Sequence, residues 1–101
     1  MSNQSPARSF TAAERRRSPL PSPTYCFAVH AVAEPDVLPR VLELFAKRNL
    51  VPTKCYSLVA GAELQVDIQM DGLESELGDF IARCLRQLVH VECVLTSLKA
   101  G

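Results

Sequence analysis

The chain has 101 residues, enough for one domain and too few for two. Apolar residues make up 48% of it, so a hydrophobic core can form without disulfides. The formal net charge is zero, but residues 1–24 hold four arginines and one glutamate, so the remaining residues are net acidic. A mildly acidic compact part argues against a nucleic-acid-binding surface.

The sequence carries no recognisable signal for membranes or secretion. No apolar run approaches the length of a membrane span, and the first residues lack the charged-then-apolar order of a signal peptide. We therefore expect a cytoplasmic protein with no membrane partner. An Arg- and Ser-rich start is also compatible with an organelle transit peptide, although it lacks an amphipathic stripe.

Four cysteines lie far apart in the sequence, with no C-x-x-C pair and no neighbouring histidines. We expect them to be reduced, mostly buried thiols that pack as small apolar side chains. A metal site or a redox pair is the alternative. The sequence predicts neither a metal nor another cofactor. The cysteines are Cys26, Cys55, Cys84 and Cys93.

Residues 1–24 differ in character from the rest of the chain. They are rich in Ser, Pro and Arg, they include the run PLPSP, and they have almost no apolar periodicity. This composition is typical of a disordered tail. The character changes at Tyr25, so we expect a single domain over residues 25–101.

The first half of this domain predicts a strand followed by a helix. Residues 25–31 are apolar on both alternating sets, as in a central strand that is covered on both faces. Apolar residues then recur at helical spacing over residues 37–48, and basic residues in the last turn complement the helix dipole. Asn49 follows where many helices end in a left-handed residue.

The second half predicts two strands, a helix and a last strand. Residues 54–60 form a strand that Gly61 and Ala62 join by a tight turn to residues 63–70, which alternate strictly between apolar and polar. Residues 91–98 form the last strand. The helix between them has an apolar stripe made of Leu73, Leu77, Phe80, Ile81, Cys84, Leu85 and Leu88.

The predicted order of elements is β-α-β-β-α-β. Two right-handed strand–helix–strand units that interleave give an α+β, ferredoxin-like sandwich. It has a four-stranded antiparallel sheet with both helices on one face. The strict alternation over residues 63–70 fits a sheet whose other face is open to water.

Several kinds of protein share this fold, so function has to be argued from sites. A heavy-metal carrier would need two cysteines in the first strand–helix loop, which has none. An RNA-binding version would need aromatic residues on the open face, where Glu63, Gln65, Asp67 and Gln69 are expected instead. An acylphosphatase-like enzyme would need an arginine in a loop that carries Glu34 and Asp36. No catalytic residue is predicted.

Other polar residues have ordinary explanations. His30 shares a strand face with Cys26 and Ala28 and is expected near the last strand, and both His30 and His90 are isolated in sequence. We expect them to be hydrogen-bonded edge or interface residues. Tyr56 is a packing or interface residue, and we interpret Lys54, Glu63 and Asp67 as part of a solvated sheet face.

The run AEPDVLPRVLELFAKRNLVPTKCYSLV, residues 33–59, shows a family resemblance. It is similar to the pattern Asn-x-Pro-Gly-Val-Leu followed by a helix ending in Phe-Ala-x-Arg-Gly-Phe-Asn-Ile. Residues 25–98 resemble an ACT domain, the small βαββαβ regulatory module of amino-acid metabolism. They look closest to the regulatory small subunit of acetolactate synthase. The positions in register are Pro35, Val37, Leu38, Val41, Leu44, Phe45, Ala46 and Arg48.

Three positions depart from that family's pattern. Ala33 stands where the family has its usual Asn, Asp36 where it has Gly, and Val51 where an Asn leads into the second strand. The resemblance implies that valine-sensing members hold their effector through these positions. Small subunits with a Pro-acid pair in the loop look more similar to this chain, and the resemblance links them to support of the catalytic subunit. The implied effector-binding residues are Ala33, Glu34, Pro35, Asp36, Val37, Leu38 and Val51.

The residue types at the helix start also argue against an amino-acid effector. A free helix N-terminus attracts a carboxylate, and glycine there allows close approach. Asp36 is the natural N-cap, because this assignment places Pro39 at the third helical position, where its missing N–H is not needed. We expect the Asp36 carboxylate to accept a hydrogen bond from the Leu38 N–H and to repel a ligand carboxylate.

Two hypotheses follow. The first is a non-catalytic regulatory or interaction subunit with a weak or lost effector site, which supports a catalytic subunit such as the acetolactate synthase large subunit. We expect it to form a homodimer through the second strand, an edge strand that carries Tyr56 and Leu58. The second is an amino-acid sensor whose ligand lies between the 33–38 loop and a neighbouring protomer.

Overall fold

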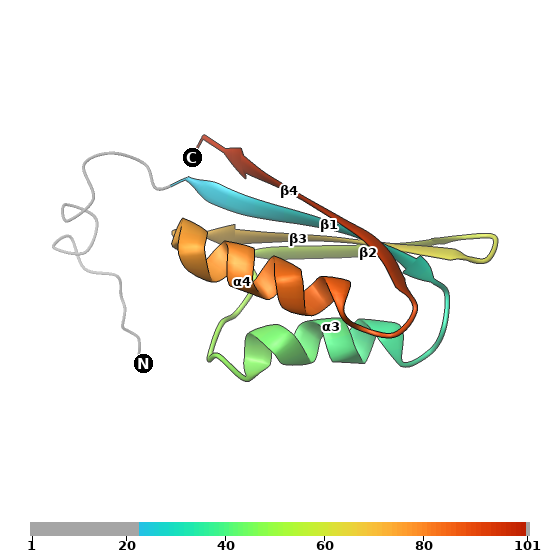
Figure 1. Cartoon of the computed structure of the whole chain (residues 1–101). Coiled ribbons are helices and arrows are strands. Elements are labelled where there is room, and N and C mark those ends of the chain that lie inside the picture. The colour runs from blue at the N-terminus through green and yellow to red at the C-terminus, as the bar shows by residue number, and fades with distance from the viewer. Residues whose placement is uncertain (1–22, 101) are drawn as a thin grey trace, which may run out of the picture.

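The structure is a computed structural model that describes residues 23–100. The order of elements is the predicted one (Figure 1). The predicted tail over residues 1–24 lies outside the described residues, except for Pro23 and Thr24, and Thr24 is the first residue of a strand. The elements are β1 (Thr24–Val32), α3 (Val37–Ala46), β2 (Lys54–Ala60), β3 (Glu63–Asp71), α4 (Ser75–Arg86) and β4 (Val91–Lys99).

The four strands form one antiparallel sheet in the order β2-β3-β1-β4. Both helices lie on one face of this sheet, and the other face is open (Figure 1). This arrangement confirms the predicted ferredoxin-like sandwich. It also makes β1 and β3 the central strands and leaves β2 and β4 as edges, as the topology of two interleaved crossovers requires.

The core lies between the sheet and the two helices. Alternate residues of β1 and β3 point into it, and the Phe27 ring meets the Phe45 ring of α3 edge to face, with centroids 5.4 Å apart. Burial of these large side chains is the main source of stability. The fully buried large side chains are Phe27, Phe45, Ile68, Ile81, Leu85, Val29, Val37, Val41 and Val66.

The hairpin between β2 and β3 has the turn that its sequence predicts. Gly61 has a φ of 62° and Ala62 does not have a positive φ, the combination of a two-residue type II′ turn. Its closing pair is Ala60 and Glu63, which fixes the register of the whole hairpin.

The end of α3 confirms the prediction for Asn49. This residue has a φ of 58°, and its N–H donates to the Ala46 carbonyl at 3.0 Å. The Leu50 N–H reaches back to the Phe45 carbonyl at 3.0 Å, which completes a Schellman motif. Leu50 also packs against the core. The helix therefore ends firmly, and the chain turns toward β2.

The inner face of α4 differs from the predicted stripe. Gly78, Ile81, Ala82 and Leu85 are its buried residues, whereas Phe80 is 39% exposed. The Phe80 ring lies on the outer surface under two guanidinium groups, with Arg48 Cζ at 4.8 Å and Arg83 Cζ at 5.8 Å from its centroid. Small residues at two core positions let α4 approach the sheet closely, and this rotates Phe80 outward.

The cysteines are free, but the prediction that most are buried is wrong. Cys55 and Cys93 are exposed, and Cys26 and Cys84 are half-buried. Cys55 lies on the helix side of the edge strand β2, which the helices cover poorly, whereas Cys93 of β4 pairs with His30 and points away from the helices. Burial nevertheless raises the pKa of the Cys55 thiol above its ordinary value.

Candidate functional site

The loop between β1 and α3 contains most of the predicted effector-binding residues. The Val37 N–H donates to the Glu34 carbonyl at 3.1 Å, which closes a four-residue turn with Pro35 at its second position. Proline favours this position because its φ is already fixed near the required value. The turn directs the chain from the sheet into α3.

Asp36 is the N-cap residue of α3, but it does not cap the helix with its side chain. Its backbone lies in the helical region, with φ −89° and ψ −3°, whereas a capping residue usually needs an extended backbone. The carboxylate instead accepts a hydrogen bond from Arg40 Nε at 3.0 Å. The predicted bond to the Leu38 N–H is therefore wrong. Arg40 lowers the pKa of Asp36 below its ordinary value through this bond.

Pro39 does occupy the third position of α3, as predicted, because the helix begins at Val37. Its missing N–H would have had no partner within the helix in any case. The first bond of the helical ladder runs from the Arg40 N–H to the Asp36 carbonyl at 3.3 Å. The helix thus tolerates a proline in its first turn without loss of a backbone bond.

Few backbone donors remain for a ligand at this loop. The N–H groups of Ala33, Glu34 and Val37 all donate to backbone carbonyls, at 2.9, 2.8 and 3.1 Å. Pro35 and Pro39 have no N–H. Over residues 33–39, only the N–H groups of Asp36 and Leu38 have no backbone acceptor within the described chain. The Asp36 carboxylate belongs to the same turn and repels an anion.

A small depression lies beside the loop. Its volume is about 300 Å³, and Ala33, Glu34 and Pro35 line it together with Val59 of β2 and Leu64 of β3. The walls are mainly apolar, with one carboxylate at the rim. Such a depression suits a short aliphatic side chain that has a positively charged group beside it. It suits a carboxylate less well.

The structure does not bring all the implied effector residues together. Asp36 is exposed, Val37 is fully buried in the core, and Leu38 is half-buried against it. Val51 lies beyond the far end of α3, next to the strand end where Lys54 pairs with Gln69. The 33–38 loop lies at the opposite end of the sheet. Val51 could join that loop in one site only across two protomers.

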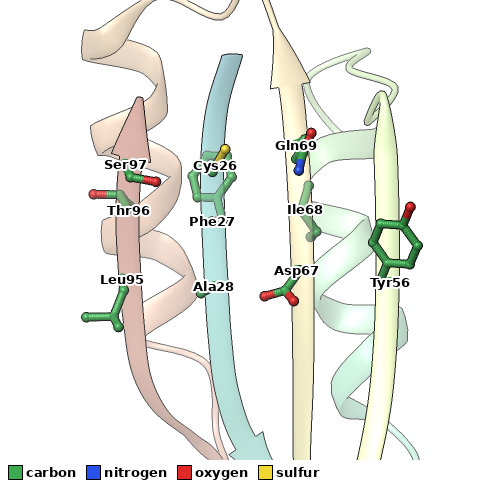
Figure 2. A pocket seen from close by; sticks show the side chains of 10 residues that line it. All are labelled: Cys26, Phe27, Ala28, Tyr56, Asp67, Ile68, Gln69, Leu95, Thr96 and Ser97. Carbon is green, nitrogen blue, oxygen red and sulfur yellow. The ribbon is translucent and has the colours of Figure 1, made fainter. Parts of the chain in front are cut away.

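The predicted interface residues Tyr56 and Leu58 lie on the open face of the sheet, which we define as the side chains pointing away from α3 and α4. All of β2 is exposed. Tyr56 stands over a hollow of about 520 Å³ that Leu95 of β4 bounds on the far side, with Ala28 and Asp67 between them (Figure 2). His30 lies on the same face and pairs in register with Cys93, as predicted.

A second polar group lies between α4 and the sheet. The Tyr25 hydroxyl donates a hydrogen bond to a carboxylate oxygen of Asp79, at the edge of a hollow that Ser75 and Thr96 also line. Burial is the main reason that the pKa of Tyr25 is raised, and the bond to Asp79 adds to it. The centroids of the Tyr25 and Phe27 rings lie 4.8 Å apart. This bond holds α4 on β1, which is a structural role.

Two further observations concern the described part of the chain. Across residues 23–100, no three side chains of the His, Cys, Asp or Glu type come together in a way that could hold a metal ion. Over the same range, neither helix has the length and apolar character needed to cross a bilayer.

The fold of this chain is similar to that of domains in solved structures. The chain is similar to the ACT domain of GTP pyrophosphokinase from Chlorobium tepidum, with a TM-score of 0.65, 7% identity, and coverage of 73% of this chain and 96% of that one. It is also similar to the C-terminal domain of the MgtC protein from Mycobacterium tuberculosis, with a TM-score of 0.63, 12% identity, and coverage of 79% and 90%. No curated protein matches the sequence.

These similarities concern the fold, the βαββαβ sandwich described above. The family model for the ACT-like domain matches residues 22–99, and the chain belongs to that family. ACT domains are regulatory domains that bind small molecules. The matched range covers all six described elements, from β1 to β4.

Proposed function

We propose that this chain is a non-catalytic regulatory subunit of ACT type, which forms a dimer and supports a catalytic subunit of amino-acid biosynthesis such as acetolactate synthase. Its effector site is weak or lost. The partnership comes from the resemblance of residues 33–59 to small subunits with a Pro-acid pair. The regulatory role comes from membership of the ACT-like family.

The use of backbone N–H groups at the 33–39 loop supports the loss of the effector site. An amino acid held at a helix N-terminus needs several free N–H groups for its carboxylate. Here three are bonded to carbonyls, two are replaced by prolines, and the remaining two are those of Asp36 and Leu38. A bound carboxylate would find two donors at most and would face a negative charge.

The test is reconstitution with the acetolactate synthase catalytic subunit. The full chain is mixed with purified catalytic subunit, co-elution is measured by size-exclusion chromatography, and acetolactate formation is measured with and without valine. We expect co-elution, higher activity and no inhibition by valine. Another thiamine-diphosphate enzyme is the control for specificity. Failure to co-elute and to change activity would contradict the proposed partner.

A second candidate function is an amino-acid sensor. The depression formed by Ala33, Glu34, Pro35, Val59 and Leu64 supports it, because about 300 Å³ accommodates an aliphatic amino-acid side chain. For a sensor of this kind, hydrogen-bond donors from a second protomer hold the carboxylate of the bound amino acid. Calorimetry with valine, leucine and isoleucine separates the two functions. A dissociation constant below about 100 μM would favour the sensor.

A further inference from the structure

The open face of the sheet exposes three large apolar side chains that the fold of one chain leaves uncovered. Tyr56 and Leu58 on β2 and Leu95 on β4 are 61%, 64% and 59% exposed. Figure 2 shows Tyr56 and Leu95 on opposite sides of the hollow, with the small side chain of Ala28 between them. Tyr56 and Leu95 line this hollow, and Leu58 lies two residues from Tyr56 on the same face of β2. Apolar side chains that gather on one face mark an interaction surface rather than scattered exposure.

We propose that a second copy of this chain covers the open face, with the two sheets packed face to face and their strands antiparallel. The two-fold axis lies between the sheets and runs perpendicular to the strands. This inference rests on the dimer of the proposed function, but it places the contact on the open face instead of the β2 edge that the sequence suggested. The argument depends on the register of the strands, on charge and on area.

The register places complementary side chains opposite each other. Tyr56 pairs with Asp67, and Leu58 pairs with Gln65, so these four residues form two neighbouring rows on the open face. A two-fold axis that is perpendicular to the strands and lies between these rows places each row opposite the other row of the partner. Tyr56 then packs on the partner's Leu58. Asp67 faces the partner's Gln65, a carboxylate against an amide donor.

The Gln65 amide suits this position. Its Nε2 already lies 3.3 Å from one carboxylate oxygen of Asp67 in the same chain. An amide nitrogen has two hydrogens, so the second can bond the partner's Asp67. The two half-buried carboxylates then share four amide donors, which is the condition under which a charge can be buried without a large penalty.

The alternative axis, parallel to the strands, is less favourable. This axis would place each row opposite the same row of the partner. It would also place β1 of one protomer opposite β3 of the other, since the two strands are adjacent at the centre of the sheet. The two Asp67 carboxylates would then be offset by about one strand spacing, roughly 4.8 Å, with no amide opposite either of them. Like charges at this separation in a desolvated interface disfavour association.

Charges at the two ends of the open face also favour the antiparallel arrangement. Lys54 stands at one end of β2, and Glu63 pairs with Ala60 at the other end. They are roughly 20 Å apart within one chain, at about 3.3 Å per residue. The perpendicular axis brings the Lys54 end of each protomer against the Glu63 end of the other, which gives two symmetric ion pairs.

The area of the open face is comparable with that of the smaller stable interfaces. Four strands, three of them with 9 residues, cover a plane of roughly 20 Å by 30 Å, or about 600 Å² per protomer. Side chains make the accessible area larger than its projection. Stable interfaces typically bury roughly 600–1,000 Å² per partner, so the open face lies at the lower end of that range.

The first test compares two neighbouring residues of β2 that point to opposite faces. Leu58 is 64% exposed on the open face, and Val59 is 61% exposed on the helix side. Sedimentation velocity of the full chain is measured over a concentration series for the wild type, Leu58→Glu and Val59→Glu, with circular dichroism as the check of folding. We expect a wild-type dimer, at least a tenfold weaker dimer for Leu58→Glu, and no change for Val59→Glu.

The second test addresses the direction of the strands. Lys54→Glu alone and Glu63→Lys alone should each weaken the dimer roughly three- to tenfold, because each puts like charges together at the rim. The double variant should restore the wild-type constant. The two residues are too far apart in one chain for an intrachain pair to explain such rescue.

Three results would overturn the proposal. Equal weakening by Leu58→Glu and Val59→Glu would indicate pairing through the β2 edge, in which both faces are equivalent. Absence of rescue in the double variant would reject the antiparallel geometry. A monomer at all concentrations would reject the dimer itself, while the partner assay with acetolactate synthase would still decide the regulatory role separately.

Discussion

The Tyr25 ring covers Gly78 so closely that α4 has no room for a side chain at this position. A methyl group on Gly78 would lie 2.6 Å from ring carbons Cδ2 and Cζ of Tyr25, well inside the normal contact distance of carbon atoms. The ring cannot move aside easily, because it is buried, packs on Phe27 and bonds Asp79. The absence of a side chain at Gly78 therefore sets how closely α4 approaches β1.

Gly78→Ala should destabilise the protein. Alanine in a helix interior usually gains about 0.5–1 kcal/mol over glycine. The clash with Tyr25 should outweigh this gain, and we expect a net loss of about 1–3 kcal/mol in the free energy of unfolding, measured by urea denaturation. In a Tyr25→Leu background the same substitution should be neutral or stabilising. An unchanged loss in that background would show that the ring is not the cause.

The raised pKa of Tyr25 predicts how stability changes in alkaline solution. A folded-state pKa above the ordinary value of about 10 means that the unfolded chain releases the proton first. The corresponding stability is present below pH 10 and is lost as the pH rises through the folded pKa. In a Tyr56→Phe background, Tyr25 is the remaining tyrosine of two, so ultraviolet titration reports on it alone. Asp79→Asn should shift this titration to lower pH.

The Asp36 carboxylate should determine whether the loop accepts an amino acid. Asp36→Gly and Asp36→Asn both remove the charge, but only glycine also allows close approach to the backbone. We expect leucine or valine to bind at least one of these variants with a dissociation constant near 100 μM or below, measured by calorimetry. Glu43→Gln is the matched control, because Glu43 is an exposed acid paired with Lys47 on the same helix.

Binding to both variants of Asp36 would identify charge as the obstacle, and binding to the glycine variant alone would identify the side chain itself. If neither binds better than the parent, Asp36 does not block the loop. Because the carboxylate makes no cap bond, either variant should change stability less than removal of an N-cap usually does.

Two phenylalanines should differ strongly in their contribution to stability. Phe45 is fully buried, and Phe45→Ala should cost about 3–5 kcal/mol. Phe80 is partly exposed under Arg48 and Arg83, so Phe80→Ala should cost about 1–2 kcal/mol. Urea denaturation of both variants measures the difference. Similar losses would mean that Phe80 belongs to the core after all.

The sequence predicted the sandwich well because its signals are periodic. Strict alternation over β3 and the left-handed residue after α3 each have one simple structural solution. The error at Phe80 has a physical reason. Hydrophobic periodicity counts large side chains and gives no weight to Gly78 or Ala82, yet these small residues mark the line of closest contact with the sheet.

The candidate site was harder to predict. Residue types and spacing made Asp36 an N-cap, but capping also depends on backbone dihedrals, and the turn at Pro35 places Asp36 in the helical region. The position of Val51 depends on where the chain goes after α3, which is a tertiary property. Local sequence therefore identified the loop but not the geometry of its donors.

The pairing of Thr24 with Lys99 places the start of β1 and the end of β4 at one corner of the sheet. The folded domain can therefore be inserted as a cassette into a surface loop of a larger polypeptide, with short connections on either side. It can also be circularly permuted, by joining this corner and opening the chain at the exposed turn of Gly61 and Ala62. In both cases the four-stranded sheet keeps its strand order.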